Sequence, residues 1–127
     1  MNGVLLLAAA LTQACLNPAK PVDPSFSYPP SMLKVVGKPV AARTLSGRVV
    51  YAGAAISDAL VEVVDAKERR LKATLTDEEG RFCFVGMHRH EYVLRISKPH
   101  FNTLLVRFRV SHKAKRKDAL LELPLSH

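Results

Sequence analysis

The feature that most constrains this chain is an alternation of apolar and polar residues, which begins at Leu45 and continues almost to the end of the sequence. The alternation has a period of two, and turn-forming residues such as Gly53 and Gly80 divide it into short runs. Strands at this spacing, with no helical period between them, predict an all-β fold, a seven-stranded antiparallel β-sandwich. The seven runs are Leu45–Tyr51, Ala59–Asp65, Leu71–Thr76, Arg81–Val85, Tyr92–Ser97, Thr103–Ser111 and Ala119–Leu123.

The alternation also predicts which residues form the core, because successive side chains of a strand point to opposite faces. Cys83 stands between two residues of the inward set and is therefore expected on the outer face. We expect a small apolar residue that is covered by the linker or an edge, with a reactive or pairing thiol as the alternative. The predicted inward set is Ala59, Val61, Val63, Phe82, Phe84, Tyr92, Leu94, Ile96, Leu104, Val106, Phe108, Val110, Leu121 and Leu123, and the outward set includes Arg48, Lys72, Arg95, Arg107 and Arg109.

The first part of the chain has a different composition. Residues 3–12 form an apolar run that fits the hydrophobic region of a secretory signal and is too short to cross a membrane as a helix, which needs about 20 residues. We therefore expect export, with a signal peptide over residues 1–14 and an extended, proline-rich tether over residues 15–42. Within that tether, Ser31–Gly37 could form a short edge strand or dock on the domain.

The end of the apolar run, Leu11–Cys15, resembles the lipobox of bacterial lipoproteins, in which a small residue precedes the cysteine that is lipidated. The resemblance implies lipidation at Cys15, which would anchor the protein to the inner or outer membrane with the domain facing the periplasm. The alternative is an ordinary cleavage site that leaves Cys15 unmodified. In that case a Cys15–Cys83 disulfide could form, although it would have to join a flexible tail to a strand.

A motif in the middle of the chain resembles a known family. Thr76–Phe84 reads T-D-E-E-G-R-F-C-F and resembles the T-D-x-x-G-x-F-x-F signature of carboxypeptidase-regulatory-like domains. Ser46–Val49, Ile56–Val63 and Tyr92–Ile96 resemble further strands of that family in the same order. The resemblance covers residues 43–125 and implies a transthyretin-like or Ig-like β-sandwich.

The motif has a structural explanation. Asp77 can accept backbone N–H groups within its turn, and Gly80 can adopt the left-handed conformation that starts the next strand. Phe82 and Phe84 are expected to insert into the core, and Thr76 is the first residue of the structural motif. The acidic run after Thr76 is not expected to bind calcium, which needs six or more oxygen ligands. Two positions depart from the family pattern, because His90-Glu91 and His100 stand where the family has glycine, the residue that adopts positive φ most readily.

The charge of the chain favours anionic partners. Nineteen Lys and Arg stand against eleven Asp and Glu, which gives a formal net charge of +8. We predict an anion-binding face, with a solvated loop that protects a sheet edge as the alternative. Export and the lack of outward aromatic residues for base stacking disfavour nucleic acid. The predicted face consists of Arg95, Arg107, Arg109, Lys113, Lys115, Arg116 and Lys117.

The sequence offers no arrangement of residues that predicts catalysis, and we expect no enzyme, cofactor or metal. The motifs G-x-S-x-G and H-E-x-x-H and a phosphate-binding loop are missing, and His88, His90 and His100 fit solvated loop residues better than metal ligands.

We therefore expect a non-catalytic envelope lipoprotein whose β-sandwich binds an envelope protein, an anionic lipid or a cell-wall polymer. The alternatives are a transthyretin-fold subunit or adaptor of a secretion-type assembly, with Val93, Leu105 and Ser31–Gly37 as its contact surface, and a carbohydrate-binding module, which the lack of Trp weakens.

Overall fold

All seven predicted runs form strands in the computed structural model, which describes residues 20 and 22–125. Three short strands that the alternation did not reveal join them, so the described part of the chain has ten strands and no helix. The seven are β3 (Ser46–Tyr51), β5 (Leu60–Val64), β6 (Arg70–Leu75), β7 (Arg81–Cys83), β8 (His90–Ser97), β9 (Thr103–Val110) and β10 (Ala119–Glu122), and the three are β1 (Leu33–Val35), β2 (Val40–Ala42) and β4 (Ala54–Ala55).

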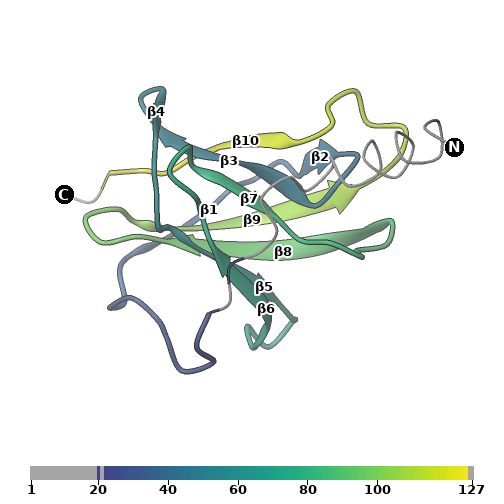
Figure 1. Cartoon of the computed structure of the whole chain (residues 1–127). Helices are drawn as coiled ribbons and strands as arrows, with labels where there is room; N and C mark the ends of the chain where they lie inside the picture. The colour runs from purple at the N-terminus through teal and green to yellow at the C-terminus, as the bar shows by residue number, and fades with distance from the viewer. Residues whose placement is uncertain (1–19, 21, 126–127) are drawn as a thin grey trace, which may run out of the picture.

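The strands form two sheets that face each other (Figure 1). The larger, six-stranded sheet has the order β1-β9-β8-β5-β6, and β2 pairs with β9 beyond β1. The smaller, four-stranded sheet has the order β10-β3-β4, and β7 pairs with the other part of β3. The fold is thus the predicted all-β sandwich.

The strand directions correct the expectation of an antiparallel sandwich. β1 and β2 both run parallel to β9, and β10 runs parallel to β3 with Ala119 opposite Gly47 and Glu122 opposite Val50. The reason is that a period of two reports only which faces of a strand are buried, and strands of either direction share it. β9 belongs to the larger sheet and β10 to the smaller one, so the chain crosses between the sheets after β9. β10 then pairs with the distant strand β3 in the parallel direction.

The core lies between the two sheets and contains the predicted inward residues. All are buried except Tyr92, which is partly buried at one end of the core. Burial of each large apolar side chain contributes about 1.5–3 kcal/mol to stability. Cys83 is covered, with 5% of its surface exposed, as predicted, but it is disulfide-bonded rather than a free thiol. Cys15, the other cysteine of the chain, lies outside the described residues, as does the predicted signal peptide.

The two positions where histidine replaces the glycine of the family have different outcomes. His100 adopts φ 76°, in the left-handed region, so the turn keeps the conformation that glycine would take with less strain. His90 begins the regular strand β8, where no glycine is needed. Neither change disturbs the strand pairing on which the sandwich depends.

The predicted tether is part of the domain wherever the structure describes it. Its later part contributes β1 and β2, which confirms that Ser31–Gly37 docks as an edge strand. The earlier part, which we call the strap (residues 22–32), packs on the outer face of the six-stranded sheet (Figure 1). Arg70 in β6 donates hydrogen bonds to the backbone carbonyl oxygens of Asp23, Pro24 and Phe26. Prolines prevent regular pairing here, but their carbonyl groups still accept hydrogen bonds.

Candidate functional site

The basic loop after β9 is held firmly against the sandwich. The N–H of Arg43 donates to the carbonyl of Arg116 at 2.9 Å, and the N–H of Thr44 donates to the carbonyl of Lys117 at 3.1 Å. The hydroxyl of Thr44 donates to the same Lys117 carbonyl at 2.8 Å. The segment between β2 and β3 therefore fixes the backbone of this loop, and its side chains project from an ordered support.

Cations from three segments gather at this end of the sandwich. Lys113, Lys115, Arg116 and Lys117 are exposed, and none of them forms a salt bridge within residues 20 and 22–125. The β7–β8 connection brings a further cation to the loop, because an Arg89 guanidinium nitrogen lies 2.8 Å from Nδ1 of His112. We call this surface the basic end, and it consists of Arg43, Arg89, Arg109, Lys113, Lys115, Arg116 and Lys117.

The predicted anion-binding face divides in the structure. Arg109 lies at the end of β9 beside the loop, and it bonds to Glu91 at 3.3 Å. Arg107 lies two residues before Arg109 in β9, on the same face of the strand. It is 3.8 Å from the same carboxylate and donates to the carbonyl of Gly37. Arg95 is not part of the basic end, because its guanidinium is bound to Glu62 in the middle of the larger sheet. The positive charge of this face is therefore concentrated in the loop.

Sequence reasoning missed two members of the basic end. Arg43 and Arg89 are not in the predicted set, and neither stands near the loop in the sequence. Their proximity comes from the backbone pairing of Arg43 with Arg116 and from the hairpin of β8 and β9, whose register places His90 opposite Val110. A search for cations next to the ends of predicted strands would have found both.

The opposite end of the sandwich carries the T-D-E-E-G turn. Oδ1 of Asp77 accepts the N–H groups of Glu79 and Arg81, both at 2.9 Å, and Gly80 has φ 77°. A Cβ on Gly80 would lie 2.5 Å from the carbonyl oxygen of Val49, so glycine is required there. Both predicted roles are confirmed.

The other motif residues tie this turn to the core. The hydroxyl of Thr76 is buried, donates to the carbonyl of Ile56 at 2.7 Å and accepts the N–H of Ala59 at 2.8 Å. Phe82 and Phe84 are buried and pack edge to face, 6.2 Å apart between ring centroids. The motif is therefore an architectural feature of the sandwich.

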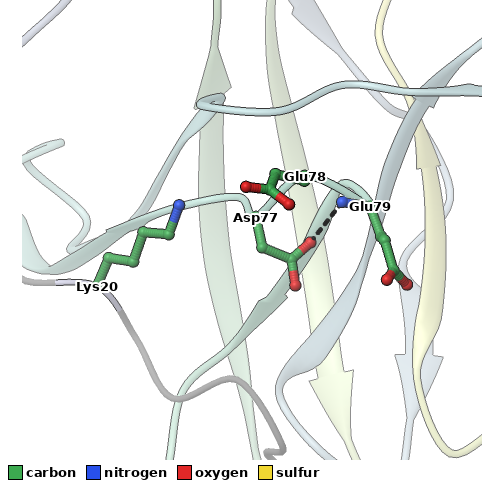
Figure 2. Close-up of a pocket in the computed structure, with 4 residues that line it drawn as sticks. All are labelled: Lys20, Asp77, Glu78 and Glu79. Carbon is green, nitrogen blue, oxygen red and sulfur yellow. Dashed lines mark hydrogen bonds between the residues drawn. The ribbon is translucent and has the colours of Figure 1, made fainter.

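A shallow hollow beside the turn is lined by acidic residues. Figure 2 shows Asp77, Glu78 and Glu79 with Lys20 extending toward the turn, and the Asp77 carboxylate bonded to the backbone of Glu79. Within residues 20 and 22–125, no group of three or more His, Cys, Asp or Glu side chains is arranged to hold a metal ion. In the same part of the chain, no helix is long and apolar enough to span a bilayer.

The larger sheet carries a second group of charges, buried under the strap. Glu62 in β5 accepts hydrogen bonds from Arg95 in β8 and from Arg70 in β6, at 2.9–3.0 Å. Burial alone would raise the pKa of Glu62, but the hydrogen bonds and charges of Arg95 and Arg70 outweigh it and hold this pKa below its ordinary value. The hydrogen bond from Arg95 to Glu62 likewise raises the pKa of Arg95, against the opposing effect of burial. Glu62 is therefore ionised at neutral pH.

A two-sheet β-sandwich with a Thr-Asp turn between two core strands defines the class of this protein. The chain belongs to the carboxypeptidase regulatory-like domain family, whose model matches residues 44–121. No curated protein matches the sequence.

Among solved structures, the chain is similar to 3-chlorocatechol 1,2-dioxygenase from Rhodococcus opacus 1CP. The two are 17% identical, with a TM-score of 0.45, and the match covers 94% of this chain and 77% of the dioxygenase chain. A likeness at this distance carries no argument about activity.

Proposed function

We propose that this chain is a non-catalytic domain of an exported envelope lipoprotein, and that its basic end binds an anionic lipid, a cell-wall polymer or an acidic surface of an envelope protein. The observation that carries the proposal is the set of four exposed loop cations without ion-pair partners in the described part of the chain. A Lys or Arg near an anionic membrane surface contributes about 1 kcal/mol, so several together give measurable binding.

The electrostatics of the rest of the surface also favour this end. Arg70, Arg81 and Arg95 are each paired with a carboxylate, and Arg107 and Arg109 share Glu91. In the acidic turn Asp77–Glu79, Glu79 is itself paired with Arg81. An approaching anion is therefore attracted to the loop, whose cations have no carboxylate partner in the described part of the chain. The lipid predicted at Cys15 would keep the domain close to such ligands.

Binding to vesicles tests the proposal, with a soluble form that carries Cys15→Ser so that no lipid contributes. We expect this form to sediment with vesicles that contain phosphatidylglycerol and not with phosphatidylcholine alone. The triple variant Lys113→Gln, Lys115→Gln, Lys117→Gln should bind at least about tenfold more weakly and with a smaller salt dependence. A matched control, Lys34→Gln, Lys38→Gln, Lys72→Gln, removes the same charge elsewhere. Equal losses in both variants would mean that net charge alone drives binding and would reject a localised site.

One observation favours a second function, that of a subunit or adaptor in a secretion-type assembly. β1 lies at the edge of the larger sheet, and Met32, Leu33 and Val35 are 77%, 48% and 65% exposed. An exposed apolar edge strand can pair with a strand of a partner protein. If it does, Val35→Lys should abolish cross-linking of this edge to envelope proteins and leave binding to anionic vesicles intact.

A further inference from the structure

A pocket lies between the strap and the outer face of the larger sheet. Its volume is about 360 Å³, within the range of small-molecule sites. The strap supplies one wall through Ser27–Ser31, and β8 and β9 supply the other through Arg95, Ser97 and Thr103. The pocket therefore exists only because the strap is docked, and it is separate from the basic end.

The polar lining of this pocket is rich in hydroxyl groups. Ser27, Ser31, Ser97 and Thr103 all line it, and the hydroxyls of Ser31 and Thr103 lie 2.8 Å apart. A hydroxyl group both donates and accepts hydrogen bonds, so several together complement a ligand that carries hydroxyl groups itself. Such a wall is less suited to an apolar ligand, which would shut water away from the Ser27 and Ser97 hydroxyls, and these have no side-chain hydrogen bond within the described residues.

The charged lining is balanced and held in place. Glu62 and Glu68 face the pocket together with Arg95, and Arg70 binds the other side of Glu62, so these four formal charges cancel. Arg95 uses three of its five N–H donors, two toward Glu62 and one toward the carbonyl of Glu68. Within the described residues the other two donors have no partner, and the Glu62 carboxylate fixes the position of the guanidinium that carries them. The charged lining itself, Glu62, Glu68 and Arg95, thus offers oriented donors and has no excess of positive charge that would select an anion.

The remaining lining is apolar and comes mostly from the strap. Pro29, Pro30, Leu33 and the ring of Tyr28 line the pocket, and the Tyr28 hydroxyl donates to the carbonyl of Asp58, which holds the ring in place. Sugars have apolar C–H faces as well as hydroxyl edges, and aromatic and proline rings pack against such faces. The lack of Trp in the chain therefore does not exclude a sugar site, because Tyr28 and the two prolines supply rigid apolar surface.

From these observations we infer that the pocket binds a neutral, polyhydroxylated group, namely a pyranose unit of a sugar or glycan. The hydroxyl lining and the free donors of Arg95 face the ligand hydroxyls, and the strap covers one face of its ring. This inference does not depend on the anion-binding proposal, because it uses a different surface and a ligand without charge.

Titration of the isotope-labelled protein, followed by NMR, tests the inference with N-acetylglucosamine and methyl β-glucopyranoside as probes. We expect saturable shifts at Ser27, Ser31, Ser97 and Thr103, and no shifts in the loop of residues 113–117. Failure of both sugars to give saturable shifts at the lining residues would overturn the inference. Glucuronate that binds as well as the neutral sugars or better would also overturn it, because the pocket would then prefer an anion.

Two variants localise the binding. Ser97→Leu fills the pocket from β8 without removing any hydrogen bond of the described chain and should weaken sugar binding at least about tenfold, whereas Ser57→Leu, outside the pocket, should not. Unchanged sugar binding by a folded Ser97→Leu variant would contradict the site. The triple Lys→Gln variant of the basic loop should keep full sugar binding, and this result separates the pocket from the anion site.

Discussion

Glu62 and Arg95 face each other across β5 and β8, with Nε of Arg95 2.9 Å from Oε1 of Glu62 and Nη2 3.0 Å from Oε2. Arg70 approaches the same carboxylate from β6, and the Glu62 side chain is only 5% exposed. One buried acid is therefore shared by two bases on neighbouring strands. Since Arg70 also holds the strap, this cluster couples the sheet to the segment that completes the pocket.

Replacement of Glu62 should make stability depend less on pH. The pKa of Glu62 is lower in the folded state, so its stabilising effect is present above the unfolded pKa of about 4.3 and is lost as pH falls through the folded pKa. We expect Glu62→Gln to lower the free energy of unfolding by about 3 kcal/mol at pH 7, because two partly buried arginines lose their counter-charge. Urea unfolding between pH 7 and pH 2 measures the difference. A difference that stays constant below pH 4 would contradict the ionised role of Glu62.

Loss of the hydrogen bonds of the Arg70 guanidinium should loosen the strap. The guanidinium of Arg70 reaches Glu62 and the carbonyls of Asp23, Pro24 and Phe26, which are spread over four residues of the strap. Arg70→Lys keeps the charge, but one ammonium group cannot bridge all these acceptors. We expect faster amide hydrogen exchange in residues 22–32 and unchanged exchange in β8 and β9.

Arg69→Lys is the matched control for this measurement, because Arg69 is exposed and pairs with Asp65 instead of the strap. Exchange in the strap should be the same in this control as in the unmodified protein. If both variants leave the strap equally protected, the hydrogen bonds of Arg70 do not hold it.

Removal of one side chain should stabilise the domain. His100 is an exposed residue at φ 76°, where a residue with a Cβ is strained by about 1 kcal/mol. His100→Gly should therefore raise the melting temperature by several degrees. Gly80→Ala is the opposite case, because φ is 77° and the added Cβ would lie 2.5 Å from the Val49 carbonyl oxygen. Thermal unfolding of both variants should give shifts of opposite sign, and a fall in melting temperature for His100→Gly would reject the strain at this turn.

How far the sequence predicts this structure depends on which contacts a pattern can report. Alternation located all seven predicted strands and the buried faces of residues such as Val61 and Phe108, because the period of side chains along a strand is local. The turn at Asp77 and Gly80 was also predictable, since its hydrogen bonds span only a few residues. Strand direction and sheet order depend on distant segments and were not predictable in the same way.

The candidate sites show the same division. The loop cations Lys113 and Lys117 stand together in the sequence and were found from it, whereas Arg43 reaches them only through the pairing of its backbone with Arg116. Arg95 was assigned to the wrong group because its partner, Glu62, lies on a neighbouring strand, and no local pattern reports that register. The pocket could not be predicted at all, since it requires a segment expected to be a spacer to pack on the sheet.

The last prediction concerns the two fates of Cys15. Lipidation and a disulfide use the same sulfur atom, so a lipid at Cys15 excludes a Cys15–Cys83 bridge. Cys83 is disulfide-bonded in the structure, whereas the lipobox-like sequence predicts a lipid.

In a bacterial host we expect a mature protein that lacks residues 1–14, carries acyl mass and sediments with membranes, because two or more acyl chains anchor stably. Cys15→Ser should release the protein from membranes, and Cys83→Ser should keep both the acyl mass and the membrane association. Intact mass decides between the fates: an unacylated chain that is lighter by two hydrogen atoms would establish the disulfide and reject the lipid anchor.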